Sequence, residues 1–208
     1  MNPSSTRQPS RRWAAACLAA PLLAASLLPW NVQAQRPSTD TPKVRISTSL
    51  GDIEAELYAA KAPQTVANFV QYVNDRHYDG TIFHRVIEGF MVQGGGYDSQ
   101  YREKKTRAPV KHEGRQSSAA GLKNTVGTLA MARTNDPHSA TSQFFINVVD
   151  NAFLDPNFQN FGYTVFGKVT SGMDVVQKIR TTPTGAGGPF PSDVPRAPVI
   201  IQSITLLK

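Results

Sequence analysis

The sequence predicts a mainly β domain, built as a closed or nearly closed antiparallel sheet whose ends are plugged by helices. Many short strand-like runs lie between clusters of Gly, Pro, Asn and Asp, whereas only two segments repeat apolar residues at helical spacing. Many short strands with few helices favour such a sheet. The domain is expected over residues 43–208, after an export signal at 1–34 and a flexible leader at 35–42 that is rich in Pro, Ser and Thr.

The first 34 residues are predicted to be an export signal. Three arginines precede the apolar run 14–28, and the tripeptide that ends at Ala34 resembles a small-residue cleavage site. The run is short for a membrane span and is interrupted by Pro21. Arg11 and Arg12 hint at a twin-arginine signal, but alanines stand where that signal has hydrophobic residues, so ordinary secretion is favoured. The alternative is a disordered N-terminus with an incidental apolar stretch.

Composition limits the possible chemistry. The only cysteine, Cys17, lies in the signal, so the mature chain would form no disulfide and carry no thiol chemistry. Residues 1–34 hold three of the 22 basic residues and none of the 15 acidic ones, so removing them lowers the net charge from +7 to +4. The densest basic cluster, residues 102–107, contains Glu103 and lies among turn formers. It indicates a solvated loop rather than a nucleic-acid surface.

The first elements of the domain are a hairpin and a helix. Two alternating runs, 44–48 and 53–57, flank turn residues and predict the hairpin. Pro63 suits a first helical turn, and the apolar residues that follow it at helical spacing predict an amphipathic helix closing near His77.

The rest of the chain predicts a second helix and six more strands. Apolar residues share one face of the helix at 173–179. Two long segments, 97–124 and 181–198, are candidates for functional loops rather than hidden elements. The strands are expected at 81–87, 90–93, 128–132, 143–148, 164–169 and 199–207.

Arg85 is the most informative residue of the chain. Side chains alternate along a strand, so Phe83, Arg85 and Ile87 are expected on one face, which places a charge beside apolar residues. Charges are rarely buried unless paired, and such conflicts tend to mark functional sites. The alternative is an edge-strand arginine whose stem lies on apolar surface while its head stays in water.

Several standard active sites lack support in the sequence. The four histidines show no zinc-ligand spacing, and no Gly-x-Ser-x-Gly pattern is present. The run Gly94-Gly95-Gly96 lacks the lysine of a phosphate loop and is expected to form a turn or bulge after a strand. We therefore expect neither a metal nor a cofactor. The histidines are His77, His84, His112 and His138.

What remains is a set of apolar, amide and guanidinium groups. Gln93, Gln143 and Arg85 supply hydrogen-bond donors and acceptors. Any one of the aromatic residues taken alone is more often ordinary core than pocket. The candidates for a small apolar pocket are Phe90, Met91, Phe144, Phe145, Phe153 and Leu154.

Three motifs together resemble the cyclophilins, the cyclosporin-binding family of peptidyl-prolyl isomerases. Residues 83–95, FHRVIEGFMVQGG, resemble the signature around the family's catalytic arginine. Residues 141–146, TSQFFI, and 165–169, VFGKV, resemble its second and third signatures. The resemblance covers about residues 44–207 in the expected order, and it points most to the bacterial periplasmic branch.

The resemblance implies a closed eight-stranded antiparallel β-barrel capped by two α-helices, with a substrate groove on its outer face. It implies that Arg85 is the catalytic residue and that Gln93 and Gln143 orient the peptide. It also implies that the backbone of Ala132 and Arg133 pairs with the substrate. The wall of the proline pocket would be Phe90, Met91, Phe145 and Leu154.

Two substrate-contacting positions depart from the eukaryotic pattern of the family. Phe153 stands where many members have tryptophan, so an indole N–H donor is absent and we expect weak cyclosporin binding. Tyr163 stands where they have histidine, and an aromatic ring with a polar tip can still edge the pocket.

The implied reaction is rotation about an X-Pro bond, and it needs no nucleophile. The expected partners are proline-containing peptides and unfolded exported proteins in the periplasm or outside the cell. We expect a monomer with no nucleic-acid partner and no stable membrane insertion after signal cleavage. The alternative is a peptide-binding chaperone or scaffold in which isomerisation is incidental. A cargo-processing hydrolase has less support, because no nucleophile and base can be paired.

Overall fold

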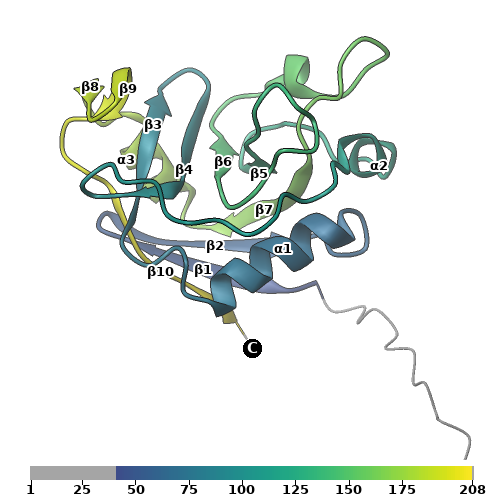
Figure 1. Cartoon of the computed structure of the whole chain (residues 1–208), viewed down its shortest axis with the longest axis horizontal. Helices are drawn as coiled ribbons and strands as arrows, with labels where there is room; N and C mark the ends of the chain where they lie inside the picture. Colours follow the sequence, from purple (N-terminus) through teal and green to yellow (C-terminus); the bar gives the residue numbers. More distant parts are fainter. Residues whose placement is uncertain (1–40, 208) are drawn as a thin grey trace, which may run out of the picture. The chain divides into compact units, whose positions relative to one another are not determined.

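Eight antiparallel strands close into a barrel in the computed structural model, which describes residues 41–207 (Figure 1). The order around the barrel is β1-β10-β3-β4-β6-β5-β7-β2, which confirms the predicted closed eight-stranded sheet. The predicted export signal lies outside the described residues. The strands are β1 (Lys43–Thr48), β2 (Gly51–Leu57), β3 (Thr81–Ile87), β4 (Met91–Asp98), β5 (Thr128–Met131), β6 (Phe144–Asn147), β7 (Val165–Ser171) and β10 (Ile200–Leu207).

The two predicted helices each pack an apolar face on the barrel core. Helix α1 (Pro63–Asn74) places Phe69 with its ring centroid 5.5 Å from that of Phe144 in β6 and 5.1 Å from that of Phe166 in β7. Helix α3 (Met173–Arg180) buries Val176 and Ile179 in the same cluster. Helix α1 stops at Asn74, short of His77, because Arg76 takes a positive φ of 53° outside the helical region.

The two long segments expected to be irregular both contain regular structure. A short helix, α2 (Gly114–Ala119), lies in the first, and a hairpin of β8 (Thr184–Gly187) and β9 (Phe190–Pro195) lies in the second. The helix has too few apolar residues to show a helical period. The hairpin is Gly- and Pro-rich and is held by backbone pairing, which needs no alternation of apolar residues. Within residues 41–207, no helix is both long and apolar enough to cross a membrane.

Helix α1 is capped by a side chain from a distant segment. Its N-cap residue, Ala62, has no side chain that can accept a hydrogen bond. The carboxylate of buried Glu113 instead accepts hydrogen bonds from the backbone N–H groups of Gln64, at 3.1 Å, and Thr65, at 2.8 Å. It also accepts one from the Thr65 hydroxyl, at 2.8 Å. The segment before α2 thus satisfies the free N–H groups at the start of α1 and ties the two together.

We expect Glu113→Ala to lower the free energy of unfolding by about 2 kcal/mol, because three donors lose their acceptor and the two on Thr65 are buried. Glu113→Gln should cost less, since it retains one carbonyl oxygen. Urea denaturation of the two variants measures the difference. The control is Glu103→Ala, which removes an exposed carboxylate from the same segment and should leave stability within about 0.5 kcal/mol of wild type. Equal stability of Glu113→Ala and wild type would contradict the capping role.

Candidate active site

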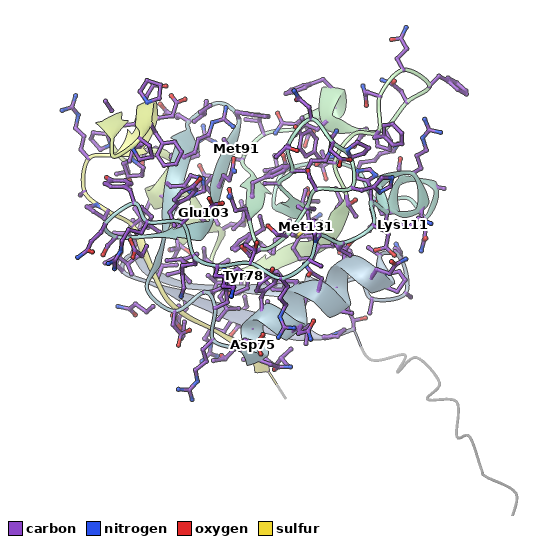
Figure 2. The ribbon with its side chains drawn as sticks, in the orientation of Figure 1. Asp75, Tyr78, Met91, Glu103, Lys111 and Met131 are labelled. Atoms are coloured by element: carbon purple, nitrogen blue, oxygen red, sulfur yellow. The ribbon has the colours of Figure 1, made fainter. Side chains whose placement is uncertain are left out.

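A cavity of about 520 Å³ lies beside β3, β4 and β6. Its apolar part belongs to a second hydrophobic cluster, separate from the barrel core, that includes Met91, Phe145 and Leu154. Figure 2 shows Met91 on the opposite side of the barrel from α1. The cavity brings together the residues that the family resemblance implied for the site: Arg85, Phe90, Met91, Gln93, Ala132, Arg133, Gln143, Phe145, Phe153, Leu154 and Tyr163.

A β-bulge between β3 and β4 interrupts the alternation just before Arg85. Phe83 pairs with Gly94, and Arg85 pairs with Gln93. Two steps along β3 therefore match one step along β4, and His84 is the extra residue.

The bulge decides which way Arg85 points. Phe83 and Val86 belong to the barrel core, whereas Arg85 lines the cavity and Ile87 packs on the outer cluster. The prediction that Phe83 shares a face with Arg85 and Ile87 is therefore wrong, because the extra residue shifts the alternation by one. Arg85 and Ile87 do share the outer face.

Phe144 was a candidate for the apolar pocket but lies in the barrel core, fully buried. Its neighbour Phe145 points outward and lines the cavity. Successive side chains of a strand face opposite sides, so β6 supplies one phenylalanine to the core and the other to the cavity.

The guanidinium of Arg85 has no partner within the described part of the chain. The residue is partly buried, and it forms neither an ion pair nor a hydrogen bond with residues 41–207. Its N–H donors are therefore available to a molecule in the cavity.

Arg133, in contrast, is held by the protein. Its Nε and Nη2 atoms donate to the carbonyl of Gly162 at 3.1 and 2.9 Å, and Nη1 donates to the carbonyl of Thr134 at 2.8 Å. Its guanidinium also lies 4.6 Å from the ring centroid of Tyr163. Gly162 has a φ of +63°, and a Cβ there would lie 2.4 Å from the nitrogen of Pro156, so this position requires glycine.

The two glutamines form an amide pair at the wall of the cavity. Gln93 Nε2 donates to Gln143 Oε1 at 3.0 Å, which leaves the Gln93 carbonyl and the Gln143 amide nitrogen without partners in residues 41–207. Gly96 makes room for this arrangement, because a Cβ there would lie 2.5 Å from the Gln143 side chain. The glycine run was expected after a strand but lies within β4, opposite the bulge.

Aromatic rings line the apolar part of the cavity. Phe90 and Phe153 stack with ring centroids 5.5 Å apart, although Phe153 is 68% exposed. Phe145 and Tyr163 meet edge to face at 5.7 Å. Edge-to-face and offset arrangements are the favourable ones for aromatic pairs. The buried floor comprises Met91, Phe145 and Leu154.

Only one backbone group of Ala132 remains free for a ligand. Its N–H donates to the carbonyl of Gln143 at 3.0 Å. Its carbonyl accepts no hydrogen bond from the residues that the structure describes. The resemblance implied that the backbone of Ala132 pairs with the substrate. At this residue the pairing can use only the carbonyl, which would accept a hydrogen bond from the peptide.

Sequence reasoning missed three residues that line the same cavity: His84, Tyr97 and Phe190. His84 stood beside Arg85 in the first motif, but nothing in the pattern separated it from the other histidines. Burial and, to a lesser extent, the positive charge of Arg85 lower the pKa of His84 to about 4. His84 is therefore neutral at neutral pH. Phe190 lies in a Gly- and Pro-rich stretch that carried no local signal.

These features define a peptide-sized groove with an apolar floor and a free guanidinium, on the outside of an eight-stranded barrel. Residues 43–206 match the family model described as cyclophilin type peptidyl-prolyl cis-trans isomerase/CLD. The chain belongs to this family and is a peptidyl-prolyl cis-trans isomerase, with proline-containing peptides as its substrate class.

Individual relatives agree with this assignment. The chain is 53% identical to peptidyl-prolyl cis-trans isomerase A of Dickeya dadantii over 171 residues, which covers 82% of this chain and 87% of the relative. It is 52% identical to peptidyl-prolyl cis-trans isomerase B of Escherichia coli over 166 residues, covering 78% and 98%. The crystal structure of a cyclophilin type isomerase from Cryptosporidium parvum superposes with a TM-score of 0.65 at 27% identity, covering 81% of this chain and 99% of that one.

Proposed function

We propose that Arg85 accelerates X-Pro rotation by donating a hydrogen bond to the nitrogen of the twisted prolyl amide. The observation that carries this proposal is a guanidinium with no partner in the described chain, positioned beside an apolar floor. In this arrangement the proline ring occupies the floor, formed by Met91, Phe145 and Leu154, and the acyl side of the bond turns past Arg85.

The chemistry of the amide explains why a fixed donor suffices. A planar amide delocalises the nitrogen lone pair, and this resonance produces a rotation barrier of about 18–20 kcal/mol. As the bond twists, the lone pair returns to nitrogen and can accept a hydrogen bond. A donor that binds the twisted state more strongly than either planar isomer lowers the barrier, and each 1.4 kcal/mol of this preference gives about a tenfold rate increase. An apolar pocket adds to the effect, because it disfavours the charge-separated planar form.

The other polar groups would orient the peptide. The free carbonyl of Gln93 and the free amide nitrogen of Gln143 can accept from and donate to a peptide backbone. The carbonyl of Ala132 supplies a further acceptor. Arg133 is bound to Gly162, so its proposed role is to hold Tyr163 and the neighbouring chain at the wall of the cavity.

We expect Arg85→Ala to lower kcat/KM about 100-fold, because the transition state loses a charged donor in a partly desolvated site. The kcat/KM of Arg85→Lys should lie between those of wild type and Arg85→Ala, since an ammonium retains the charge but not the planar fork. NMR exchange spectroscopy on an X-Pro peptide, or a coupled peptide assay, measures the rates.

The matched control is Arg115→Ala, which removes an exposed arginine outside the cavity and should retain wild-type activity. If Arg85→Ala were as active as wild type, the assigned mechanism would be wrong. Aggregation assays with the same variants separate catalysis from chaperone-type peptide binding, because a chaperone role would survive the loss of Arg85.

Weak cyclosporin binding is a second proposed property of this cavity. Phe153 is exposed at the rim and has no N–H to donate. We expect Phe153→Trp to lower the Kd for cyclosporin about three- to tenfold, the range of one net hydrogen bond. Inhibition titrations measure it, with Phe153→Leu as the variant that should not tighten binding. Equal affinity of Phe153→Trp and wild type would count against this assignment.

The biological setting that we propose is the folding of exported proteins in the periplasm or outside the cell, by a monomer that binds no nucleic acid. The basic, apolar and small-residue regions of residues 1–34 support export. Protein recovered from the periplasm or medium of a bacterial host should begin at Gln35, as N-terminal sequencing would reveal. Retention of the full-length chain in the cytoplasm would overturn this setting, and sedimentation of the recovered protein tests the monomer.

A further inference from the structure

Three aromatic side chains, which we call the aromatic trio, line the cavity beyond Arg85. They are His84 in β3, Tyr97 in β4 and Phe190 in β9, and each contributes to the lining. None of them belongs to the floor proposed for the proline ring. The cavity therefore has a second aromatic region that the proposed mechanism does not use.

The trio is a packed unit rather than three separate rings. Phe190 stacks on His84 with centroids 5.3 Å apart, and Tyr97 meets Phe190 edge to face at 5.1 Å. His84 and Tyr97 lie 4.8 Å apart. The contacts attach the β8–β9 hairpin to the barrel through the Phe190 side chain. Phe190 and Tyr97 both remain partly exposed, so a ligand in the cavity can reach their rings.

The trio carries no charge at neutral pH. Burial and the charge of Arg85 hold the pKa of His84 at about 4, and burial raises the pKa of Tyr97. His84 is only 3% exposed, and its Nδ1 atom is buried with no hydrogen-bond partner in the described residues. A neutral aromatic surface of this kind favours an apolar or aromatic side chain over a charged one.

Arg85 lies between the floor and the trio along the β3–β4 hairpin. Met91 pairs with Ile87 at the floor end, and Gln93 pairs with Arg85 in the middle. His84 follows on β3, and Tyr97 lies further along β4. An extended peptide rises about 3.4 Å per residue, which matches the rise of the strands beneath it. A peptide that runs along these strands with its proline on the floor would carry a neighbouring side chain to the trio.

We propose that the aromatic trio is a specificity subsite, which receives a large apolar side chain, preferably aromatic, from a residue within two positions of the isomerised proline. This inference rests on the proposed function of the cavity, since it takes the floor to be the proline site. Phe190 is the principal determinant, because it covers the other two rings and comes from a hairpin outside the barrel.

The test uses peptides that contain a single proline. At each of the four positions within two residues of this proline, one at a time, a peptide with Phe is compared with the same peptide with Gly. For wild type, kcat/KM should be about five- to tenfold higher for Phe than for Gly at one or more positions, as expected for partial burial of an aromatic side chain. In Phe190→Ala this ratio should fall to within twofold of one. Phe190→Tyr keeps an aromatic ring and should retain most of the preference.

The matched control is Phe158→Ala, which removes a fully exposed phenylalanine outside this cavity and should leave both the rates and the ratio unchanged. Thermal unfolding of Phe190→Ala and the NMR signals of its barrel strands report whether the fold is kept. If the hairpin detaches in Phe190→Ala, Phe190→Leu keeps an apolar side chain without a ring and should still lower the ratio.

The inference is overturned if Phe and Gly peptides react equally in wild type at all four positions. It is equally overturned if the ratio is the same in wild type, Phe190→Ala and Phe190→Leu. Neither result bears on the proposed role of Arg85. That role is tested by comparing the rates of wild type and Arg85→Ala on the Gly peptides. Failure of that role would instead appear as equal rates for wild type and Arg85→Ala.

Discussion

The β-bulge between β3 and β4 is the constraint on which the site depends. A closed barrel has an interior filled by side chains, and a charge placed there would be costly to desolvate. Phe83 and Val86 occupy that interior, and the extra residue, His84, turns Arg85 to the outer face. One inserted residue therefore keeps the core apolar and presents a guanidinium to the groove.

The two arginines that line the outer groove, Arg85 and Arg133, differ in their hydrogen-bond partners. Arg133 is bound to the carbonyls of Gly162 and Thr134 and lies on Tyr163, so its donors are used within the protein. Arg85 has no such partners among the described residues. Arg133 thus stabilises the wall of the groove, and Arg85 keeps free N–H donors. This arrangement is expected where a site stabilises a transition state through fixed dipoles rather than through proton transfer. The neutral His84 beside Arg85 fits this chemistry, because it adds no second positive charge.

Distant segments supply what the barrel strands cannot. Glu113, from the segment before α2, satisfies the free N–H groups of α1. Phe190, from the β8–β9 hairpin, extends the aromatic lining of the cavity beyond Arg85. Both residues lie in segments without apolar periodicity. In each segment a single side chain contacts a part of the structure that is distant in sequence. Long segments of this kind commonly carry such roles.

The sequence by itself determined the eight barrel strands and the two larger helices, because alternation and helical spacing are local properties of the chain. The family resemblance also named most of the residues that line the cavity, while their roles stay predictions. Only the tertiary structure decided that Phe83 and Arg85 face opposite sides, that Phe144 belongs to the core, and that Phe190 joins the cavity. The physical reason is that a bulge and a long-range contact depend on how the closed barrel aligns its strands, and that alignment leaves no periodic signal in any one segment.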